Sequence, residues 1–247
     1  MEQRAKLMYA EGIESVVVMP FTPELAQLTP EQFAQRVLHD QLDARAVLVG
    51  DNFRFGAGQA GNVDTLRQLG EKLGFTTEII HEVKRHGRTV SSSAIRRILE
   101  CGEISIANRL LEHAYLIEGE VIPGRGVGSK QTVPTLNLKT SAELIPAGGV
   151  YITRTTDLDS PDHTWDSITN IGYRPTFDDG GGLSIETFLL SAFTGETPHR
   201  IRLQFLRRVR EERKFESPEA LKAQIFKDVS RAQAYFRRLR RWSQRQE

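Results

Sequence analysis

The sequence predicts an α/β N-terminal part followed by an antiparallel β-barrel or sandwich that ends in a helix. In the first part, short β-branched runs alternate with helical patterns, which is typical of an α/β layer architecture. From residue 115 onward, short strand-like runs are separated by Gly, Pro and Asp, which is typical of antiparallel barrels and sandwiches. The length of 247 residues exceeds the usual size of a single domain and favours two domains.

The first part is predicted to contain parallel strands and capped helices. Its buried strands are expected at residues 16–18, 46–49 and 75–80. Thr29, Pro30 and Gln32 form the pattern of a capping box with a first-turn proline, which predicts a helix start. Further helices are predicted over residues 62–73, 91–99 and 103–113. Gly74 and Gly102 follow two of these helices and are typical of helix ends.

The second part is predicted to be built from antiparallel strands. These strands are expected at residues 116–122, 149–155, 184–190 and 201–209. A final helix is predicted to begin at Ser217, because a proline and a glutamate follow it and the later apolar residues recur on one face. The change of pattern near His113 predicts a boundary between a domain of residues 1–112 and a domain of residues 113–247.

Composition and charge argue against several classes of partner. The chain has 33 Lys and Arg residues against 32 Asp and Glu residues, so its net charge of +1 does not favour nucleic acid or a membrane surface. Its single cysteine excludes an intramolecular disulfide and a multi-cysteine zinc site. No secretory signal or membrane-spanning apolar run is visible. We therefore expect a cytoplasmic protein without nucleic-acid or membrane partners, whose oligomeric state the sequence does not set.

A glycine-dense segment directly after a predicted strand is the first candidate for phosphate binding. Gly124, Gly126 and Gly128 would let the backbone approach a phosphate closely and direct its N–H groups toward it. The spacing fits neither a P-loop nor a dinucleotide-binding fingerprint. A plain turn is therefore the alternative interpretation.

Three side chains in the following segments are candidates for metal and proton chemistry. Thr135 and Asn137 lie two apart in an extended segment, so they would point to the same face and offer oxygen atoms of the kind that Mg²⁺ prefers. Glu186 is a lone carboxylate within an apolar strand, which indicates either a solvated face or a functional role. On the residues alone, the simpler interpretations are a polar edge beside a turn and an exposed glutamate.

The region from about residue 113 to residue 228 resembles the riboflavin kinase domain. Four segments carry the resemblance in family order, namely the glycine loop and residues 134–137, 170–176 and 185–190. The resemblance implies a six-stranded barrel with a C-terminal helix, and transfer of the ATP γ-phosphate to riboflavin to give FMN. Mg²⁺ with ATP is the implied cofactor, and riboflavin and FMN are the implied substrate and product.

The resemblance also implies a role for each candidate residue. Glu186 would be the catalytic base, and Arg174 would help to shape the flavin site. The residues that would bind ATP are Gly124, Gly126, Gly128, Thr135 and Asn137, of which Thr135 and Asn137 would also hold the metal ion. The chain departs from the family pattern at Thr132, Val133 and Leu136, where a glycine, an aromatic residue and a small residue are usual.

The first part is similar to the FMN adenylyltransferase domain of bacterial bifunctional riboflavin kinase/FAD synthetases. Residues 19–21, 49–56 and 90–96 carry this similarity. It implies a nucleotidyltransferase-like, Rossmann-like fold with Phe53 and Phe55 near the flavin. The residues that would face the ATP phosphates are Ser91, Ser92, Ser93 and Arg96. Such a helix start suits an anion because its N–H groups are unpaired and its dipole end is positive.

The family's glycine-rich His-x-Gly-His loop does not occur in this sequence. In the family this loop follows an opening strand, which should precede Arg4, and its histidines stabilise the transferring group. We therefore expect an adenylyltransferase domain truncated at its N-terminus, with weak or absent FAD synthesis. Truncation of a longer bifunctional enzyme is the favoured explanation, and a kinase-only descendant is the alternative.

A non-catalytic barrel that binds flavin or RNA is the alternative of another class. Its basis is a basic cluster near the C-terminus, which contains Arg237, Arg238, Arg240, Arg241 and Trp242. A solvated helix end that complements the helix dipole is the simpler interpretation of this cluster.

Overall fold

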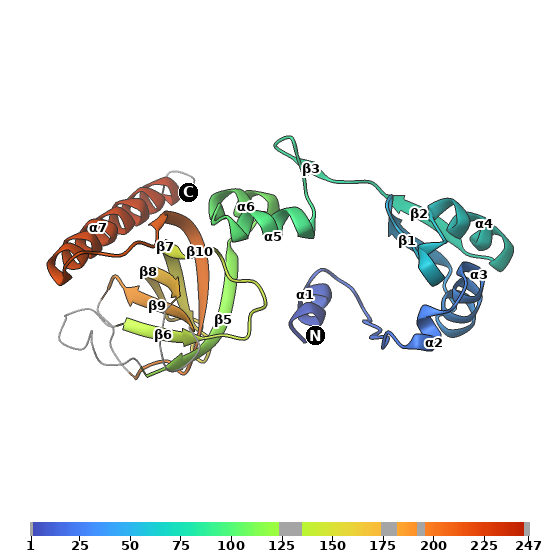
Figure 1. Ribbon diagram of the computed structural model, residues 1–247, viewed down its shortest axis with the longest axis horizontal. Helices are drawn as coiled ribbons and strands as arrows, with labels where there is room; N and C mark the ends of the chain where they lie inside the picture. The colour runs from blue at the N-terminus through green and yellow to red at the C-terminus, as the bar shows by residue number, and fades with distance from the viewer. Residues whose placement is uncertain (1, 124–134, 174–181, 192–195, 245–247) are drawn as a thin grey trace. The chain divides into compact units, whose positions relative to one another are not determined.

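The structure is a computed structural model that describes residues 2–123, 135–173, 182–191 and 196–244. The chain divides into two compact units, Met1–Val83 and Lys84–Glu247, and Figure 1 labels the helices and strands of both. The boundary between these two compact units differs from the boundary expected between the adenylyltransferase-like and kinase domains, at residues 112 and 113. That domain boundary stays a prediction.

The first unit is an α/β layer in which helices cover one face of a parallel sheet. Its elements are α1 (Glu2–Ala10), α2 (Pro23–Ala26), α3 (Pro30–Phe33), the π-helix η1 (Ala34–Gln41), β1 (Ala46–Gly50), the 3-10 helix η2 (Ala57–Gln59), α4 (Val63–Leu73) and β2 (Thr76–Ile80). β1 and β2 pair in parallel, with Ala46 opposite Thr76. Val47 and Val49 pack against the core, whereas Leu48 is 58% exposed. The two strands are therefore buried on one face only.

The strand predicted over residues 16–18 is wrong. In the described part of the chain these residues pair with no strand, and Val17 and Val18 are 63% and 57% exposed. β-Branched residues favour strands mainly because they fit a pleated, half-buried surface. No neighbouring strand supplies that surface here, so the propensity of the valines does not produce a strand.

The capped helices of the first unit are confirmed. The Thr29 hydroxyl accepts a hydrogen bond from the Gln32 backbone N–H at 3.2 Å, and Gln32 Oε1 accepts one from the Thr29 N–H at 3.1 Å. These two bonds satisfy donors that a helix start leaves unpaired. α4 ends at Gly74, whose φ of 85° lies in the left-handed region that favours glycine.

The second unit contains the closed six-stranded barrel that the resemblance implies. Its elements are β3 (Lys84–Arg85), β4 (Arg88–Thr89), α5 (Ser92–Glu100), α6 (Ile104–Leu111), β5 (Tyr115–Ile122), β6 (Thr135–Lys139), β7 (Gly149–Asp157), β8 (Thr164–Tyr173), β9 (Leu183–Leu189), β10 (Arg200–Glu211) and α7 (Pro218–Ser243). The barrel order is β10-β5-β6-β9-β8-β7, and neighbouring strands are antiparallel. Sequence periodicity predicts β5, β7, β9 and β10, whereas the sequence indicates only an extended segment at Thr135 and Asn137 in β6 and the end of a strand near residue 170 in β8.

The barrel interior combines apolar side chains with a ladder of buried hydroxyls. Thr153 Oγ1 lies 2.8 Å from Ser167 Oγ and 2.7 Å from Thr169 Oγ1. Thr169 Oγ1 in turn lies 2.9 Å from Thr187 Oγ1. Buried polar groups cost free energy unless they are hydrogen-bonded, and the ladder supplies these bonds. It links β7, β8 and β9 inside the barrel.

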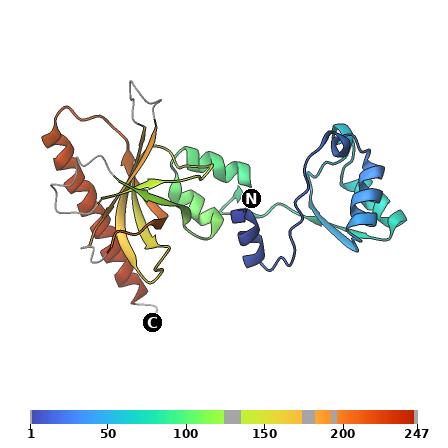
Figure 2. The ribbon, with the colours of Figure 1, turned by 90° about the horizontal axis from the view of Figure 1, so that it is seen from below.

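α7 packs along the outside of the barrel (Figures 1 and 2). It begins as predicted, with the Ser217 hydroxyl capping its first turn. Its Ala232 and Phe236 are buried against β7 and β8, and its Asp228 forms a 2.7 Å ion pair with Arg210 of β10. Among the described helices, α7 included, none is long and apolar enough to cross a membrane.

α5 and α6 belong to the same compact unit as the barrel. Leu99 of α5 is fully buried in a core that includes residues of the barrel interior. Arg208 of β10 donates a 2.6 Å hydrogen bond to the Gly148 carbonyl and a 3.3 Å bond to the Cys101 carbonyl at the end of α5. Its guanidinium also lies over the Tyr151 ring, and burial raises the pKa of Tyr151 to about 12. α5 is therefore held to the barrel by both apolar packing and Arg208.

Replacing Asp228 by alanine should destabilise the second unit by about 3 kcal/mol, because Arg210 would keep a buried charge without its carboxylate partner. Urea unfolding followed by circular dichroism measures the loss. Arg240→Ala is the control, because it breaks an ion pair to Asp166 in which the Arg240 side chain is 61% exposed, and it should cost less than about 1 kcal/mol. A loss for Asp228→Ala that is as small as the control would contradict the prediction.

Candidate functional site

Three neighbouring strands of the barrel bring polar side chains into one row. In the register of β6, β9 and β8, Asn137 lies opposite Glu186, and Glu186 lies opposite Asn170. Residues directly opposite in antiparallel strands have Cβ atoms about 4.5–5.5 Å apart, so these side chains are neighbours. The three residues are half-buried, whereas Leu136 and Ile185, which adjoin them in sequence, are buried in the barrel core. The row therefore lies on the outer face of the barrel.

The polar row begins next to the part of the barrel surface that α7 covers. Phe188 and Ile168 lie two residues from Glu186 and Asn170 along β9 and β8, and they pack into the apolar cluster that includes residues of α7. One further step along the same face, the side chains become polar. The outer face thus changes from a helix-covered apolar surface to an accessible polar one at these two strands.

The side chains of the row are suited to bind a ligand. Ser184 donates a hydrogen bond from its hydroxyl to Glu186 Oε1 at 3.1 Å, which orients the carboxylate. Toward residues in the described part of the chain, the side chains of Thr135, Asn137 and Asn170 make no hydrogen bond. Half-buried hydroxyl and amide groups in this situation can bind polar groups of a ligand without losing a protein partner.

The structure brings together three of the residues predicted for the kinase reaction. Thr135 and Asn137 share one face of β6, and Asn137 lies beside Glu186. Leu136, between them, is 5% exposed, so this departure from the family pattern packs in the barrel core. Other predicted residues and departures lie outside the described residues, namely Gly124, Gly126, Gly128, Arg174, Thr132 and Val133.

Sequence reasoning assigned no role to Asn170 and Ser184, although both face the site. Ser184 has a recognisable signal, because a residue two positions before Glu186 on a strand shares its face. Asn170 belongs to the family segment 170–176, but its place beside Glu186 depends on the register between β8 and β9. Periodicity within one strand carries no information about that register.

The Thr135 hydroxyl and the Asn137 amide, at one end of the row, fit a magnesium site. Within the described residues, no group of three or more His, Cys, Asp and Glu side chains is placed to hold a metal ion. Mg²⁺ that arrives with ATP keeps phosphate oxygens and waters as ligands and needs only a few hard oxygen atoms from the protein. The Thr135 hydroxyl and the Asn137 amide oxygen are atoms of this kind on adjacent outward positions of β6.

The aromatic residues of the predicted flavin loop contribute to the core of the first unit. Phe55 is 6% exposed and stacks on the half-buried Phe53, with ring centroids 5.5 Å apart. A Cβ on Gly61 would lie 2.6 Å from the Phe55 ring, so glycine lets the loop close around that ring. Phe55 therefore supports the loop, and contact of either ring with a flavin stays a prediction.

The serine-rich segment forms the N-terminus of α5, as predicted. The Ser91 hydroxyl caps the helix by accepting a hydrogen bond from the Ala94 backbone N–H at 3.2 Å. Ser92, Ser93 and Arg96 are exposed. The predicted flavin loop lies in the first unit, whereas this helix start lies in the second. Binding of ATP phosphates at α5 stays a prediction.

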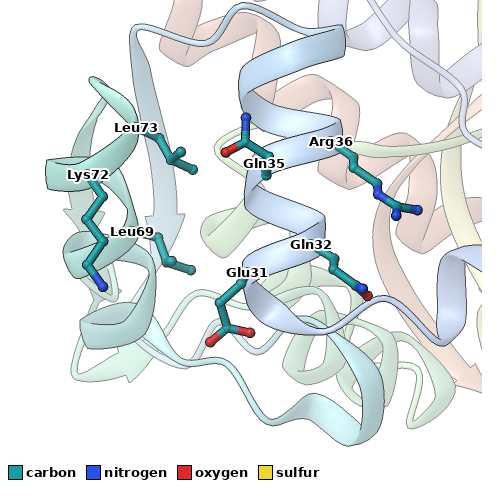
Figure 3. Close-up of a pocket in the computed structure, with 7 residues that line it drawn as sticks. All are labelled: Glu31, Gln32, Gln35, Arg36, Leu69, Lys72 and Leu73. Carbon is teal, nitrogen blue, oxygen red and sulfur yellow. The ribbon is translucent and has the colours of Figure 1, made fainter.

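The first unit also has a surface hollow of about 270 Å³ beside α3, η1 and α4 (Figure 3). It is lined by Glu31, Gln32, Gln35, Arg36, Leu69, Lys72 and Leu73. A hydrogen bond from its own backbone N–H, then one from the Thr29 hydroxyl, lowers the pKa of Glu31, and Lys72 adds to the effect. The residues predicted for flavin or phosphate binding do not line this hollow.

Two family models match the chain. The model described as riboflavin kinase matches residues 111–236, which include the barrel and most of α7. The model described as FAD synthetase matches residues 1–94. The fold and the site thus define a riboflavin kinase barrel that follows an FAD synthetase domain with a nucleotidyltransferase-like fold.

The chain belongs to the family of bifunctional riboflavin kinase/FMN adenylyltransferases. Its relative from Pseudomonas fluorescens is 35% identical over 91% of this chain and 71% of its own length. The relative from Escherichia coli K12 is 32% identical over 94% of this chain and 74% of its own length. A crystal structure described as a macrolide-efflux protein from Streptococcus pneumoniae matches 94% of this chain and 74% of its own with a TM-score of 0.82. At 22% identity, that likeness shows the fold alone.

Proposed function

We propose that this chain phosphorylates riboflavin, transferring the γ-phosphate of Mg-ATP to give FMN. The observation that carries the proposal is the row in which Glu186 lies between Asn137 and Asn170 on the outer face of the barrel. The membership of the chain in the riboflavin kinase family supports the same reaction. Phosphoryl transfer depends mainly on positioning and charge neutralisation, and the row provides groups for both.

Glu186 is the group that takes the proton in this proposal. Its carboxylate accepts the proton of the terminal hydroxyl of riboflavin while that oxygen bonds to the γ-phosphorus and the bond from phosphorus to the ADP oxygen breaks. The Ser184 hydroxyl orients the carboxylate for this step. Thr135 and Asn137 would hold the Mg²⁺ ion, which would supply positive charge to the phosphate oxygens. In this proposal, Gly124, Gly126 and Gly128 bind ATP.

Adenylylation of FMN to FAD is the second activity that this family membership suggests. The relatives are described as bifunctional, and α5 begins with a serine-rich, exposed N-terminus of the kind that binds anions. We propose the kinase reaction as the principal function, in a cytoplasmic protein whose domains meet between residues 112 and 113.

Glu186→Gln should lower FMN formation by about two to four orders of magnitude, because glutamine preserves the shape of the side chain but cannot accept the proton. The measurement is incubation with riboflavin, ATP and Mg²⁺, followed by chromatographic separation of riboflavin, FMN and FAD. Glu120→Gln is the matched control, because Glu120 is an exposed carboxylate on β5 of the same barrel. FMN formation by Glu186→Gln at the rate of this control would show that Glu186 is not the catalytic base.

Asn137→Ala should raise the Mg²⁺ concentration needed for half-maximal FMN formation by about tenfold or more. Even residues that only support metal ligands contribute about that much to metal affinity. Mg²⁺ titration at saturating ATP and riboflavin measures the effect. Lys139→Ala, at the exposed end of the same strand, should leave the Mg²⁺ dependence unchanged. Identical Mg²⁺ curves for the two variants would show that Asn137 is not a metal ligand.

A further inference from the structure

Glu212, directly after β10, is a carboxylate whose side chain reaches the proposed kinase site. The last residue of β10, Glu211, lies opposite Gly149 of β7. Gly149 in turn lies opposite Ile171 of β8. The Glu212 side chain crosses β7 at this point and extends to β8, where the polar row of the site begins.

One glycine makes this crossing possible. A Cβ on Gly172 of β8 would clash with Glu212 Oε1, whereas a Cβ on Gly148 would make only an ordinary contact with Oε2, at 3.5 Å. The same Cβ on Gly172 would lie 3.4 Å from Asn170 Nδ2, so the Glu212 carboxylate and the Asn170 amide lie around one point. Gly172 therefore leaves the space that the Glu212 carboxylate fills.

This position is adjacent to the proposed base. Gly172 lies opposite Ser184, whose hydroxyl donates to Glu186, and Asn170 lies opposite Glu186 itself. Two residues along a strand correspond to about 7 Å. The Glu212 carboxylate thus lies about two residues along the barrel surface from Glu186, the proposed base.

Glu212 has no cation to neutralise it in the described part of the chain. It is exposed, and it forms no ion pair or hydrogen bond with the described residues. The arginines nearest in sequence have other partners, since Arg210 pairs with Asp228 and Arg213 donates to Gln224 at 2.5 Å. Within the described residues, its negative charge and acceptor oxygens are therefore available to a bound molecule.

We propose that Glu212 positions riboflavin by accepting a hydrogen bond from a hydroxyl of its polyol chain. This inference rests on the proposed kinase function. A carboxylate next to the triphosphate would be repelled, whereas the polyol is neutral and offers several O–H donors. Because the terminal hydroxyl must lie at Glu186, a hydroxyl farther along the same chain comes within reach of Glu212, and Asn170 between them offers a second polar contact.

Glu212→Ala should raise the KM for riboflavin by about tenfold, with kcat within about threefold of the parent, because hydrogen bonds to charged groups contribute roughly that much to binding. Glu212→Gln, which keeps an acceptor oxygen but no charge, should give a smaller increase. Quenching of riboflavin fluorescence on binding provides a second measurement that does not depend on turnover. Glu216→Gln is the control, since Glu216 is an exposed carboxylate before α7.

Gly172→Ala tests the same position without changing the carboxylate. Its methyl group would displace the flexible end of Glu212, so it should raise the riboflavin KM as Glu212→Ala does. In the double variant the two increases should not multiply, because both remove one interaction. Melting temperatures of all variants within a few degrees of the parent would confirm that they fold.

The outcomes separate this inference from the proposed function. If the parent chain makes FMN and the Glu212 and Gly172 variants bind riboflavin normally, the inference alone is wrong. If these variants change the KM for ATP or the Mg²⁺ dependence in place of the riboflavin KM, Glu212 faces the nucleotide and the inference is again wrong. If the parent chain makes no FMN, the proposed function fails and the inference fails with it.

Discussion

The register between β6, β9 and β8 is the constraint on which the candidate site depends. In a closed barrel each residue faces either the core or the outside, and a shift of one residue would reverse every side chain of a strand. The buried Leu136 and Ile185 fix this choice, because exposing either would lose the free energy of its burial. Asn137 and Glu186 are thereby forced onto the same outer face, side by side. The geometry of the site is a consequence of the packing of the core.

Two further sets of interactions keep that face in place. Inside, the hydroxyl ladder from Thr153 through Thr169 to Thr187 joins β7 to β8 and β9, two of the strands that carry the site. Outside, α7 covers the apolar end of β8 and β9 and is tied to β10 by the buried pair of Asp228 and Arg210. A group that accepts a proton must be held within hydrogen-bond reach of its substrate. Strands that are packed on both faces hold such a group in a fixed position.

Those parts of the fold that depend on local patterns could be predicted from the sequence. The capping box at Thr29 and the left-handed Gly74 are local signals, and both helices lie where these signals place them. Residues 16–18 misled the prediction because strand formation needs a partner strand, which local propensity does not report. Glu186 and Asn137 were recognised by family resemblance, but their adjacency, and that of Asn170, is set by pairing between strands. The sequence does not indicate a role for Glu212, because its reach depends on the absence of a side chain at Gly172 on another strand.

The position of α5 shows that a compact structural unit need not have the same boundaries as a family domain. The FAD synthetase model ends at residue 94, within the first turn of α5, whereas the riboflavin kinase model begins at residue 111. Yet the C-terminal half of α5 is buried with the barrel core at Leu99 and held by Arg208 at the Cys101 carbonyl. A helix is rigid over this length, so its serine-rich start must follow any movement of the barrel. The helix proposed to bind phosphate in the adenylylation of FMN is therefore part of the same rigid unit as the riboflavin kinase barrel.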